Sequence, residues 1–469
     1  MRKNLSFYLV TLLLFGAGIY WVLSYGSRLS PLASGQPPLA GSADSGGLFA
    51  ALRHPLAVLL VQVIVIITVA RALGALARRL YQPAVSGEIL AGILLGPSLL
   101  GLLWPQTQSF LFPVESLDTL RLLSQIGVIL FMFVLGIELD IKKLRHKAAA
   151  AVLVSHASIV VPFFLGVVAA LFVYREFAPA NVSFTPFALF MGVAMSITAF
   201  PVLARILEDR QMTGSPLGVI ALACAAVDDV TAWCLLALVV AVVNANGLVN
   251  ATVTVVLALG FVGVMLWFVR PQVARVVREE FAEPHHGKSL VAGVLIFVFI
   301  AALATEVIGI HALFGAFVAG LVMPPSVQLR DFLRQRLETV GAVVLLPLFF
   351  AFTGLRTQIG LLDDLASWLW CLGLIGVAVV GKLGGSMLAA RWAGMSWRDA
   401  AALGALMNTR GLIELIVLNL GYDLGILSPR IFTMMVLMAL VTTFMTGPLL
   451  TLLGVGRRSY VATQVRTSE

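Results

Sequence analysis

The run SPLGVIALACAAVDDVTAWCLLALVVAVV, residues 215–243, places two neighbouring carboxylates, Asp228 and Asp229, in the middle of an apolar segment long enough to span a bilayer. An ionisable side chain in the hydrocarbon core is costly, so each one needs a reason. The pair could instead cap a helix that starts later, but residues 217–224 are uninterrupted and apolar. The two aspartates are therefore the first candidates for a functional site.

Buried neighbouring carboxylates have a definite chemistry. Adjacent helical residues point about 100° apart, so one aspartate can face a partner while the other faces a cavity. Burial disfavours the charged form of a carboxylate, and two carboxylates repel each other. A proton should therefore bind here under physiological conditions, and a metal cation could replace it. That exchange is the chemistry of an antiporter.

The composition of the whole chain agrees with a membrane location. Of 469 residues, 60% are hydrophobic and 12% are charged, whereas a soluble domain is near half apolar and a quarter charged. The net charge of +8 comes from short Lys and Arg clusters between apolar runs, which is a topology signal and not a nucleic-acid-binding pattern. The three cysteines lie inside apolar runs, and no Cys/His cluster has metal-ligand spacing.

Apolar runs predict about 14 transmembrane helices. They cover residues 6–25, 55–77, 84–104, 119–138, 149–173, 184–206, 215–243, 250–269, 289–305, 309–323, 339–355, 365–389, 399–420 and 431–454. The basic clusters fall at alternate helix ends, which predicts a multi-pass protein of the bacterial inner membrane with both termini in the cytoplasm.

Three regions follow from this pattern. Residues 1–48 hold an N-terminal hydrophobic helix and a periplasmic linker. The helix could be a signal peptide, but we expect a retained extra span because the apolar run is long and lacks a clear cleavage site. Residues 49–456 form the transmembrane domain. Residues 457–469 form a short cytoplasmic tail, with no room for a nucleotide-binding domain.

A short internal echo suggests an inverted repeat. Ala91-Gly92-Ile93-Leu94-Leu95-Gly96-Pro97 ends one predicted helix, and Ala319-Gly320-Leu321-Val322-Met323-Pro324 ends another, seven helices later. The two helices then cross the membrane in opposite senses, as in many secondary transporters. We expect an all-α fold with about 13 core helices in two inverted halves, plus the N-terminal helix.

Lys382 is the cation that matches the acidic pair. It stands near the middle of the run 365–389, too deep to reach the interface easily. A buried ammonium needs a carboxylate partner, and either Asp228 or Asp229 could supply it, with Asp228 favoured.

Two predicted helices carry mid-span interruptions. In Ser196-Ile197-Thr198-Ala199-Phe200-Pro201 the proline removes the helical donor of the Ile197 carbonyl, beside the Thr198 hydroxyl. The second break is at Asn408-Thr409-Arg410-Gly411, with Glu414 one turn later. Because the repeat pairs these helices, two crossed, discontinuous helices with opposed dipoles should make an ion site at the midplane.

Other polar residues have plainer interpretations. Arg410 and Glu414 are four residues apart on one helical face, so a structural ion pair competes with direct participation. We expect Glu88, Glu138 and Glu306, near helix ends, to be structural or capping. His156 and His311 fit core histidines better than proton relays.

At these residues the sequence resembles the monovalent cation:proton antiporter-2 family, which includes bacterial Kef-like and NapA-like antiporters and the plant CHX cation/proton exchangers. The resemblance is carried by residues 86–97, 196–203 and 408–415 and covers about residues 50–456. It implies a six-helix core with two crossed, unwound helices, a dimerisation domain and a homodimer.

The resemblance also implies roles for single residues. Asp229 would be the ion-binding aspartate, Asp228 the preceding position and Lys382 the core lysine that pairs with it, and Thr198 would mark the first unwound point. Asp228 stands where the plant exchangers usually have asparagine, so electrogenic and electroneutral exchange both stay open.

The resulting prediction is an antiporter of Na⁺ or K⁺ against protons, with the ion bound by Asp229, Asp228 and Thr198 and supported by Lys382, Arg410, Glu414 and Asn408. No enzyme activity, nucleic acid or cofactor is expected. A sodium-coupled organic-anion symporter or a channel of similar fold is the alternative, although an adjacent acidic pair favours a small cation.

Overall fold

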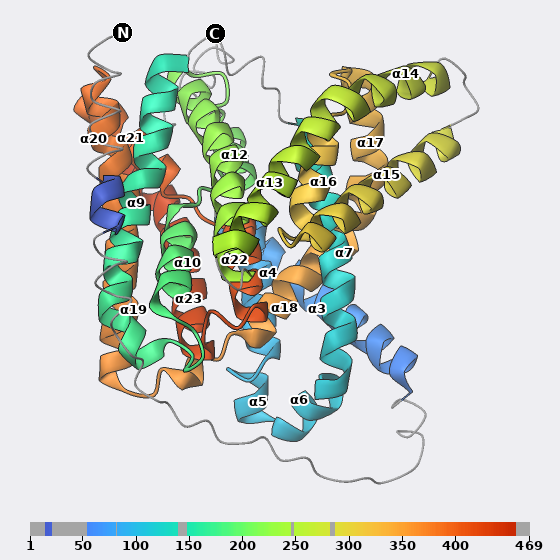
Figure 1. Cartoon of the computed structure of the whole chain (residues 1–469). Coiled ribbons are helices and arrows are strands. Elements are labelled where there is room, and N and C mark those ends of the chain that lie inside the picture. Colours follow the sequence, from blue (N-terminus) through green and yellow to red (C-terminus); the bar gives the residue numbers. More distant parts are fainter. Residues whose placement is uncertain are drawn as a thin grey trace, which may run out of the picture.

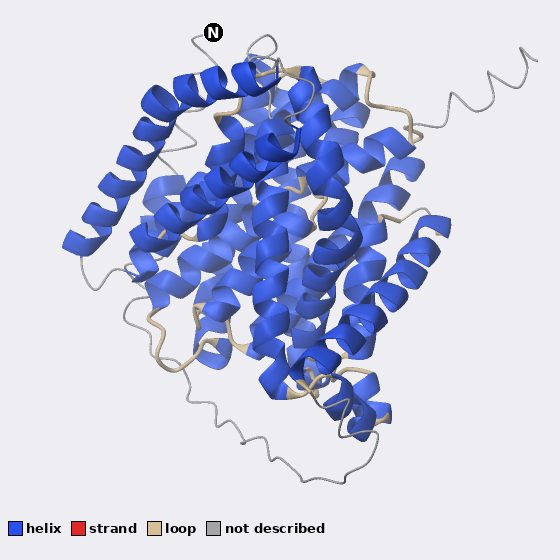
Figure 2. Cartoon of the chain, turned by 90° about the vertical axis from the view of Figure 1, so that its right-hand side faces the viewer, coloured by secondary structure: helices blue, strands red, loops and turns tan. Residues whose placement is uncertain are grey.

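A computed structural model describes residues 15–20, 54–80, 82–138, 148–244, 248–281 and 287–455. Throughout these residues the secondary structure is helical and contains no strand (Figure 2). The tail 457–469 and most of the predicted helix 6–25 lie outside the described residues.

The helices follow the apolar runs closely, with breaks that the runs alone do not show. They are α3 (Pro55–Arg79), α4 (Ala84–Leu95), α5 (Leu100–Leu103), α6 (Pro105–Leu111), α7 (Val114–Glu138), α9 (Ala148–Phe177), α10 (Phe184–Ser196), α11 (Phe200–Asp209), α12 (Pro216–Asn244), α13 (Leu248–Val264), α14 (Arg270–Phe281), α15 (Gly287–Ile308), α16 (Ala312–Leu321), α17 (Val327–Val340), α18 (Leu346–Arg356), α19 (Leu365–Val379), α20 (Gly385–Trp392), α21 (Trp397–Met407), α22 (Leu412–Asp423) and α23 (Pro429–Leu452). π-Helical turns at Met265–Val269, Gly341–Leu345 and Val380–Gly384 join α13 to α14, α17 to α18 and α19 to α20.

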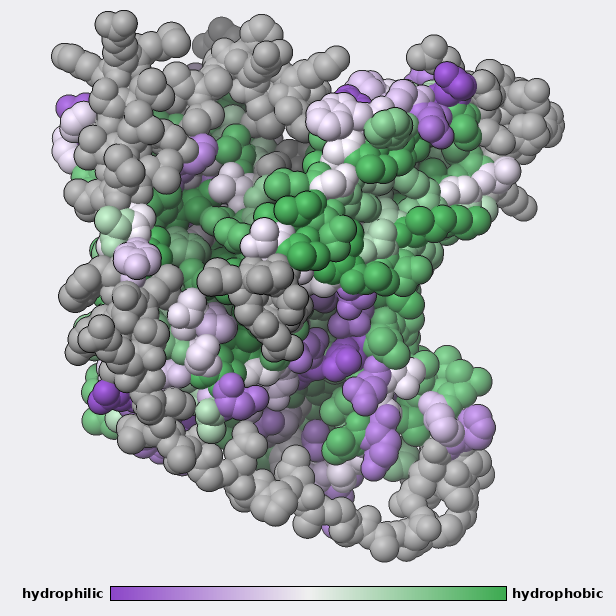
Figure 3. Space-filling view, viewed as in Figure 1, coloured by the Kyte–Doolittle hydropathy of each residue, from purple (hydrophilic) through white to green (hydrophobic). Residues whose placement is uncertain are grey.

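The described residues make a multi-span membrane protein. Ten helical stretches are long and apolar enough to cross a bilayer, and the pair α21/α22, bent by 43°, is an eleventh. The shorter apolar helices α10 and α16 fill the remaining core positions that the sequence predicts. Side chains on the outer faces of α13 and α15 are hydrophobic and exposed, as expected where a protein meets lipid (Figure 3).

The helices pack in two groups that lie side by side in Figure 1. We call α9–α12 with α19–α23 the core bundle, and α3, α4, α7 and α15–α18 the flanking bundle. Within each bundle the helices pack closely on one another, whereas contacts between the bundles are few, for example those between α18 and α22. This division matters because a substrate path in such a protein can run between two bodies that move against each other.

Glycine packing agrees with the predicted inverted repeat. A Cβ on Gly92 of α4 would lie 2.1 Å from the carbonyl oxygen of Ala351 in α18, and a Cβ on Gly320 of α16 would lie 2.3 Å from that of Phe133 in α7. The repeat relates α4 to α16 and α7 to α18, so the glycine of each matching motif serves the same close crossing. A packing requirement therefore explains why the Ala-Gly motif recurs in the sequence.

Candidate functional site

The predicted crossing of two interrupted helices is present. α10 ends at Ser196 and α11 begins at Phe200, while α21 ends at Met407 and α22 begins at Leu412. The unwound segments hold each other, because the N–H of Ala199 donates to the carbonyl oxygen of Thr409 at 3.0 Å. Both breaks fall where the sequence predicts them, inside the core bundle.

Two basic side chains lie at the C-terminal end of α10. Arg410 donates from Nη1 to the carbonyl oxygen of Ala194 (2.9 Å) and from Nη2 to that of Met195 (2.7 Å). Lys382 donates to the next free carbonyl, that of Ser196. Positive charge here complements the negative end of the helix dipole and satisfies carbonyls that have no helical donor. The sequence predicts both cations but not this capping role.

Asp228 is fully buried and fully partnered. Its Oδ1 accepts a hydrogen bond from the hydroxyl of Ser155 at 2.6 Å, and its Oδ2 accepts from Ser158 at 2.5 Å and from Thr198 at 2.6 Å. The ammonium of Lys382 lies 3.2 Å from Oδ2, and it also donates to the carbonyl oxygen of Ser158 at 3.0 Å. The favoured pairing of Lys382 is thus the one that the structure contains.

Asp229 has the opposite surroundings. Its side chain is 1% exposed, and neither carboxylate oxygen has a well-formed hydrogen bond to any described residue. Asp228, the backbone amide of Phe200 and Lys382 act on it electrostatically. A buried carboxylate without partners is unstable as an anion, so this position requires a proton or a cation.

The second crossed helix also carries polar atoms without partners. Arg410 and Glu414 form the predicted ion pair, with Nη1 and Oε1 3.1 Å apart and both side chains fully buried. Oε2 of Glu414 and both amide atoms of Asn408 have no partner among the described residues. The structural ion pair is therefore present, and it leaves polar atoms free beside the crossing.

The structure thus brings Asp228, Asp229, Thr198 and Lys382 to one point. It adds Ser155 and Ser158 of α9, which sequence reasoning missed. The sequence feature that could have found them is a pair of hydroxyls three residues apart on one face of an apolar helix.

Glu306 accepts a hydrogen bond from the N–H of Ala312 at 2.7 Å, which agrees with the predicted capping role.

A wide cavity leads toward this point from one end of the bundle. Its volume is about 490 Å³, and its walls include Phe200 and Glu208 of α11, Glu138 of α7 and Leu337 of α17. Because Phe200 is the first residue of α11, the cavity runs between the two bundles up to the residue whose amide faces Asp229. Among the described residues no group of three His, Cys, Asp or Glu side chains could chelate a metal ion.

Comparison with known proteins agrees with this geometry. The sequence profile of the family described as sodium/hydrogen exchanger, transmembrane, matches residues 64–455. The chain belongs to this family.

Two relatives in the curated set illustrate the range of the family. The chain is 44% identical over 397 residues to the Na⁺/H⁺ antiporter NhaS4 of Synechocystis sp., covering 84% of this chain and 97% of that protein. It is 40% identical over 414 residues to cation/H⁺ antiporter 17 of Arabidopsis thaliana, covering 87% of this chain and 50% of that protein. The chain therefore spans about half the length of such plant relatives.

A solved structure shares the fold. The sodium proton antiporter MjNhaP1 of Methanocaldococcus jannaschii superimposes with a TM-score of 0.61 at 15% identity, over 84% of this chain and 96% of that one. At that identity the likeness concerns the arrangement of helices, and site roles must come from the residues of this chain.

Proposed function

We propose that this family member is a secondary active antiporter that exchanges a monovalent cation, Na⁺ or K⁺, for protons by alternating access. The observation that carries the proposal is the contrast between the two aspartates. Asp228 is bound by three hydroxyls and Lys382, whereas Asp229 is buried and accepts no hydrogen bond from any side chain that the structure describes. Relatives that are named Na⁺/H⁺ or cation/H⁺ antiporters support it.

In this mechanism Asp229 binds either a proton or a cation. Either ligand neutralises the carboxylate, so the core bundle carries no uncompensated charge when it moves. Asp228 and Thr198 lie beside Asp229 and complete the site, and Lys382 and Arg410 hold the end of α10 in place. Unwound backbone at the crossing offers carbonyl oxygens at the midplane, where a dehydrated cation needs them.

The same charges argue against an organic-anion symporter. Such a protein would be expected to offer anion-binding groups for its solute, yet the two buried basic side chains at the crossing, Lys382 and Arg410, already bind carbonyl and carboxylate oxygens. The site instead presents an unpartnered acid, which suits a small cation and a proton.

Further parts of the proposal concern the setting of the protein. Residues 49–456 form the exchanger domain in the bacterial inner membrane, with both termini in the cytoplasm, because Lys and Arg clusters mark one side. The wide cavity then opens to the cytoplasm, since Arg205 and Arg334 line it. We further propose a homodimer. The driving force is an ion gradient, so neither cofactor nor enzymatic step is required.

Proteoliposomes with an imposed pH gradient test the proposal. A pH-sensitive dye inside the vesicles should report proton movement when Na⁺, K⁺ or Li⁺ is added in turn, and the cation with the lowest half-saturating concentration is the substrate. If no monovalent cation moves protons while the protein remains folded and correctly inserted, the proposal is wrong.

A further inference from the structure

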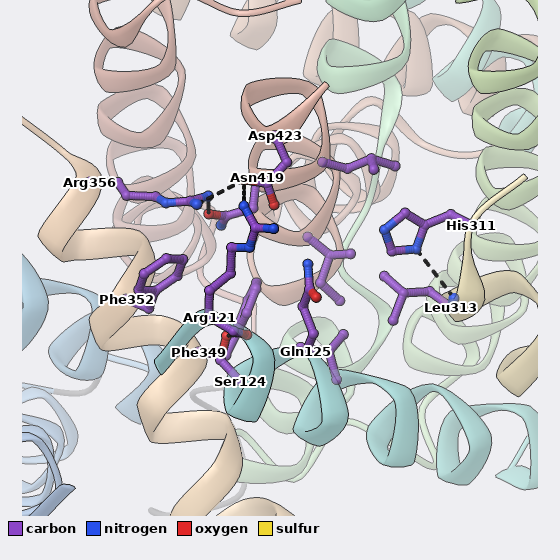
Figure 4. A pocket seen from close by; sticks show the side chains of 13 residues that line it. Arg121, Ser124, Gln125, His311, Leu313, Phe349, Phe352, Arg356, Asn419 and Asp423 are labelled. Carbon is purple, nitrogen blue, oxygen red and sulfur yellow. Dashed lines mark hydrogen bonds and ion pairs between the residues drawn. The ribbon is translucent and has the colours of Figure 1, made fainter. Parts of the chain in front are cut away.

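At the end of the bundle opposite the wide cavity, charged residues bridge the two bundles. Asp423 is the last residue of α22, in the core bundle. Its Oδ1 lies 2.8 Å from Nη2 of Arg356, the last residue of α18, and 3.7 Å from Nη1 of Arg121 in α7. Figure 4 shows both guanidinium groups turned toward this carboxylate. One acid of the core bundle therefore pairs with two cations of the flanking bundle.

Further contacts surround the ion pair of Arg356 and Asp423. The guanidinium of Arg356 lies 4.2 Å from the ring centroid of Phe352, in its own helix, and 5.0 Å from that of Tyr422 in α22. It also donates to the amide oxygen of Asn419 at 3.2 Å. One turn deeper, Nδ2 of Asn419 donates to the hydroxyl of Thr353 at 2.7 Å. The two hydrogen bonds and the contact of Arg356 with Tyr422 join α22 to α18.

The two bundles are held together at this end by the ion pairs and hydrogen bonds. The cavity beneath the ion pairs has a volume of about 30 Å³, against about 490 Å³ for the cavity at the other end. Ion pairs and hydrogen bonds thus join the two bundles at one end, whereas the larger cavity lies between them at the other. α22 begins at the crossing and ends at Asp423, so the helix links the ion site directly to the end that the ion pairs join.

We propose that Asp423, with Arg356 and Arg121, is the latch of the external gate, which must open each time the site turns outward. This proposal rests on the proposed antiport function and adds to it the residues that hold the external side shut. Arg356–Asp423 ion pairing stabilises the state in which the wide cavity is open, so its loss shifts the population toward the other state. Partial exposure of the pair, 15% for Arg356 and 19% for Asp423, keeps the bond weak enough to break in each cycle.

Cysteine accessibility tests the latch without measuring transport. Reporter cysteines are placed at Leu420, which lines the small cavity, and at Leu337, which lines the wide one, in full-length protein whose three native cysteines are replaced. Labelling by a hydrophilic maleimide is timed in detergent, so membrane orientation does not enter. With Asp423→Asn, the cysteine at 420 should react at least about twofold faster, because losing a partly exposed ion pair shifts the equilibrium between the two states by about that factor. The cysteine at 337 should react more slowly.

A matched control keeps the result specific. Arg430 and Asp363 form an ion pair at 3.2 Å at the same end, but Arg430 lies in α23 and Asp363 precedes α19, and these two helices pack together in the core bundle. Asp363→Asn should leave both labelling rates unchanged. Equal rates in Asp423→Asn and its parent overturn the latch. Faster labelling at 420 with no decrease at 337 also overturns it, since that pattern reports local loosening. Failed antiport with the expected labelling would overturn only the proposed function.

Discussion

The ammonium of Lys382 lies 3.2 Å from Oδ2 of Asp228, and both side chains are completely buried. Charges without water are tolerable only with good partners, and here three hydroxyls and two backbone carbonyls complete the set. The pair therefore fixes Asp228, and our proposal assigns the exchange of proton and cation to the other aspartate of the acidic motif, Asp229.

The first prediction concerns this pair. Lys382→Ala should lower the free energy of unfolding by about 3–5 kcal/mol, because it strands a buried carboxylate. Adding Asp228→Asn should recover part of that loss, so that the two changes are non-additive by more than about 0.5 kcal/mol. Thermal unfolding of the single and double variants in detergent gives the cycle. Additive losses would mean that the two charges do not stabilise each other.

The second prediction concerns the cap of α10. Arg410→Gln removes two bonds to helix-end carbonyls and leaves Glu414 buried without its cation, so stability should fall by about 3–5 kcal/mol. Arg430→Gln, in a partly exposed pair with Asp363, is the control and should change stability by about 0.5 kcal/mol or less. Similar melting temperatures for the two variants would contradict the capping role.

The third prediction concerns the glycine crossings. Gly92→Ala places a Cβ where the Ala351 carbonyl lies, so α4 and α18 must separate, at a cost of about 1–3 kcal/mol or more. Gly373→Ala in α19 meets no atom within 4 Å and should be neutral or stabilising by about 0.4–1 kcal/mol. Each variant is heated, and the fraction of protein that remains monodisperse on size-exclusion chromatography is compared between the two. Equal tolerance of both alanines would contradict the close crossing.

Asp228, Asp229 and Lys382 were predictable because charge inside an apolar run is costly, and the breaks near Thr198 and Asn408 were predictable from Pro201 and Gly411. The partner of Lys382 needed the fold, since either aspartate could have faced it. Ser155 and Ser158 gave little signal, because hydroxyls in membrane helices usually bond to their own backbone.

The contacts between bundles were beyond the sequence for a different reason. Arg121, Arg356 and Asp423 lie at separate predicted helix ends, where isolated charges are ordinary and no local pattern pairs them. Only the packing of α18 against α22 and α7 brings them together. The Gly92 and Gly320 crossings lie inside the flanking bundle and did leave a signal in the sequence, because each crossing imposes the same small residue.

The fourth prediction concerns pH. If protons and cations compete for one carboxylate, the half-saturating cation concentration should rise by up to about tenfold for each pH unit below the midpoint of proton binding, while the maximal rate at saturating cation changes little. Initial rates in proteoliposomes clamped at equal pH on both sides, measured by radioactive cation exchange, give this dependence. A maximal rate that falls with pH at constant half-saturation would indicate separate proton and cation sites.

The most direct test of the central claim is proton movement by Asp229→Asn. The amide keeps the shape of the side chain and removes the group that exchanges a proton for a cation. Dye-reported proton efflux on adding Na⁺ or K⁺ to proteoliposomes should disappear, while the purified variant keeps the elution profile and melting behaviour of the parent protein. Asp363→Asn, at the exposed end of the bundle, should transport normally. Cation-dependent proton movement at the parental rate in Asp229→Asn would contradict the account.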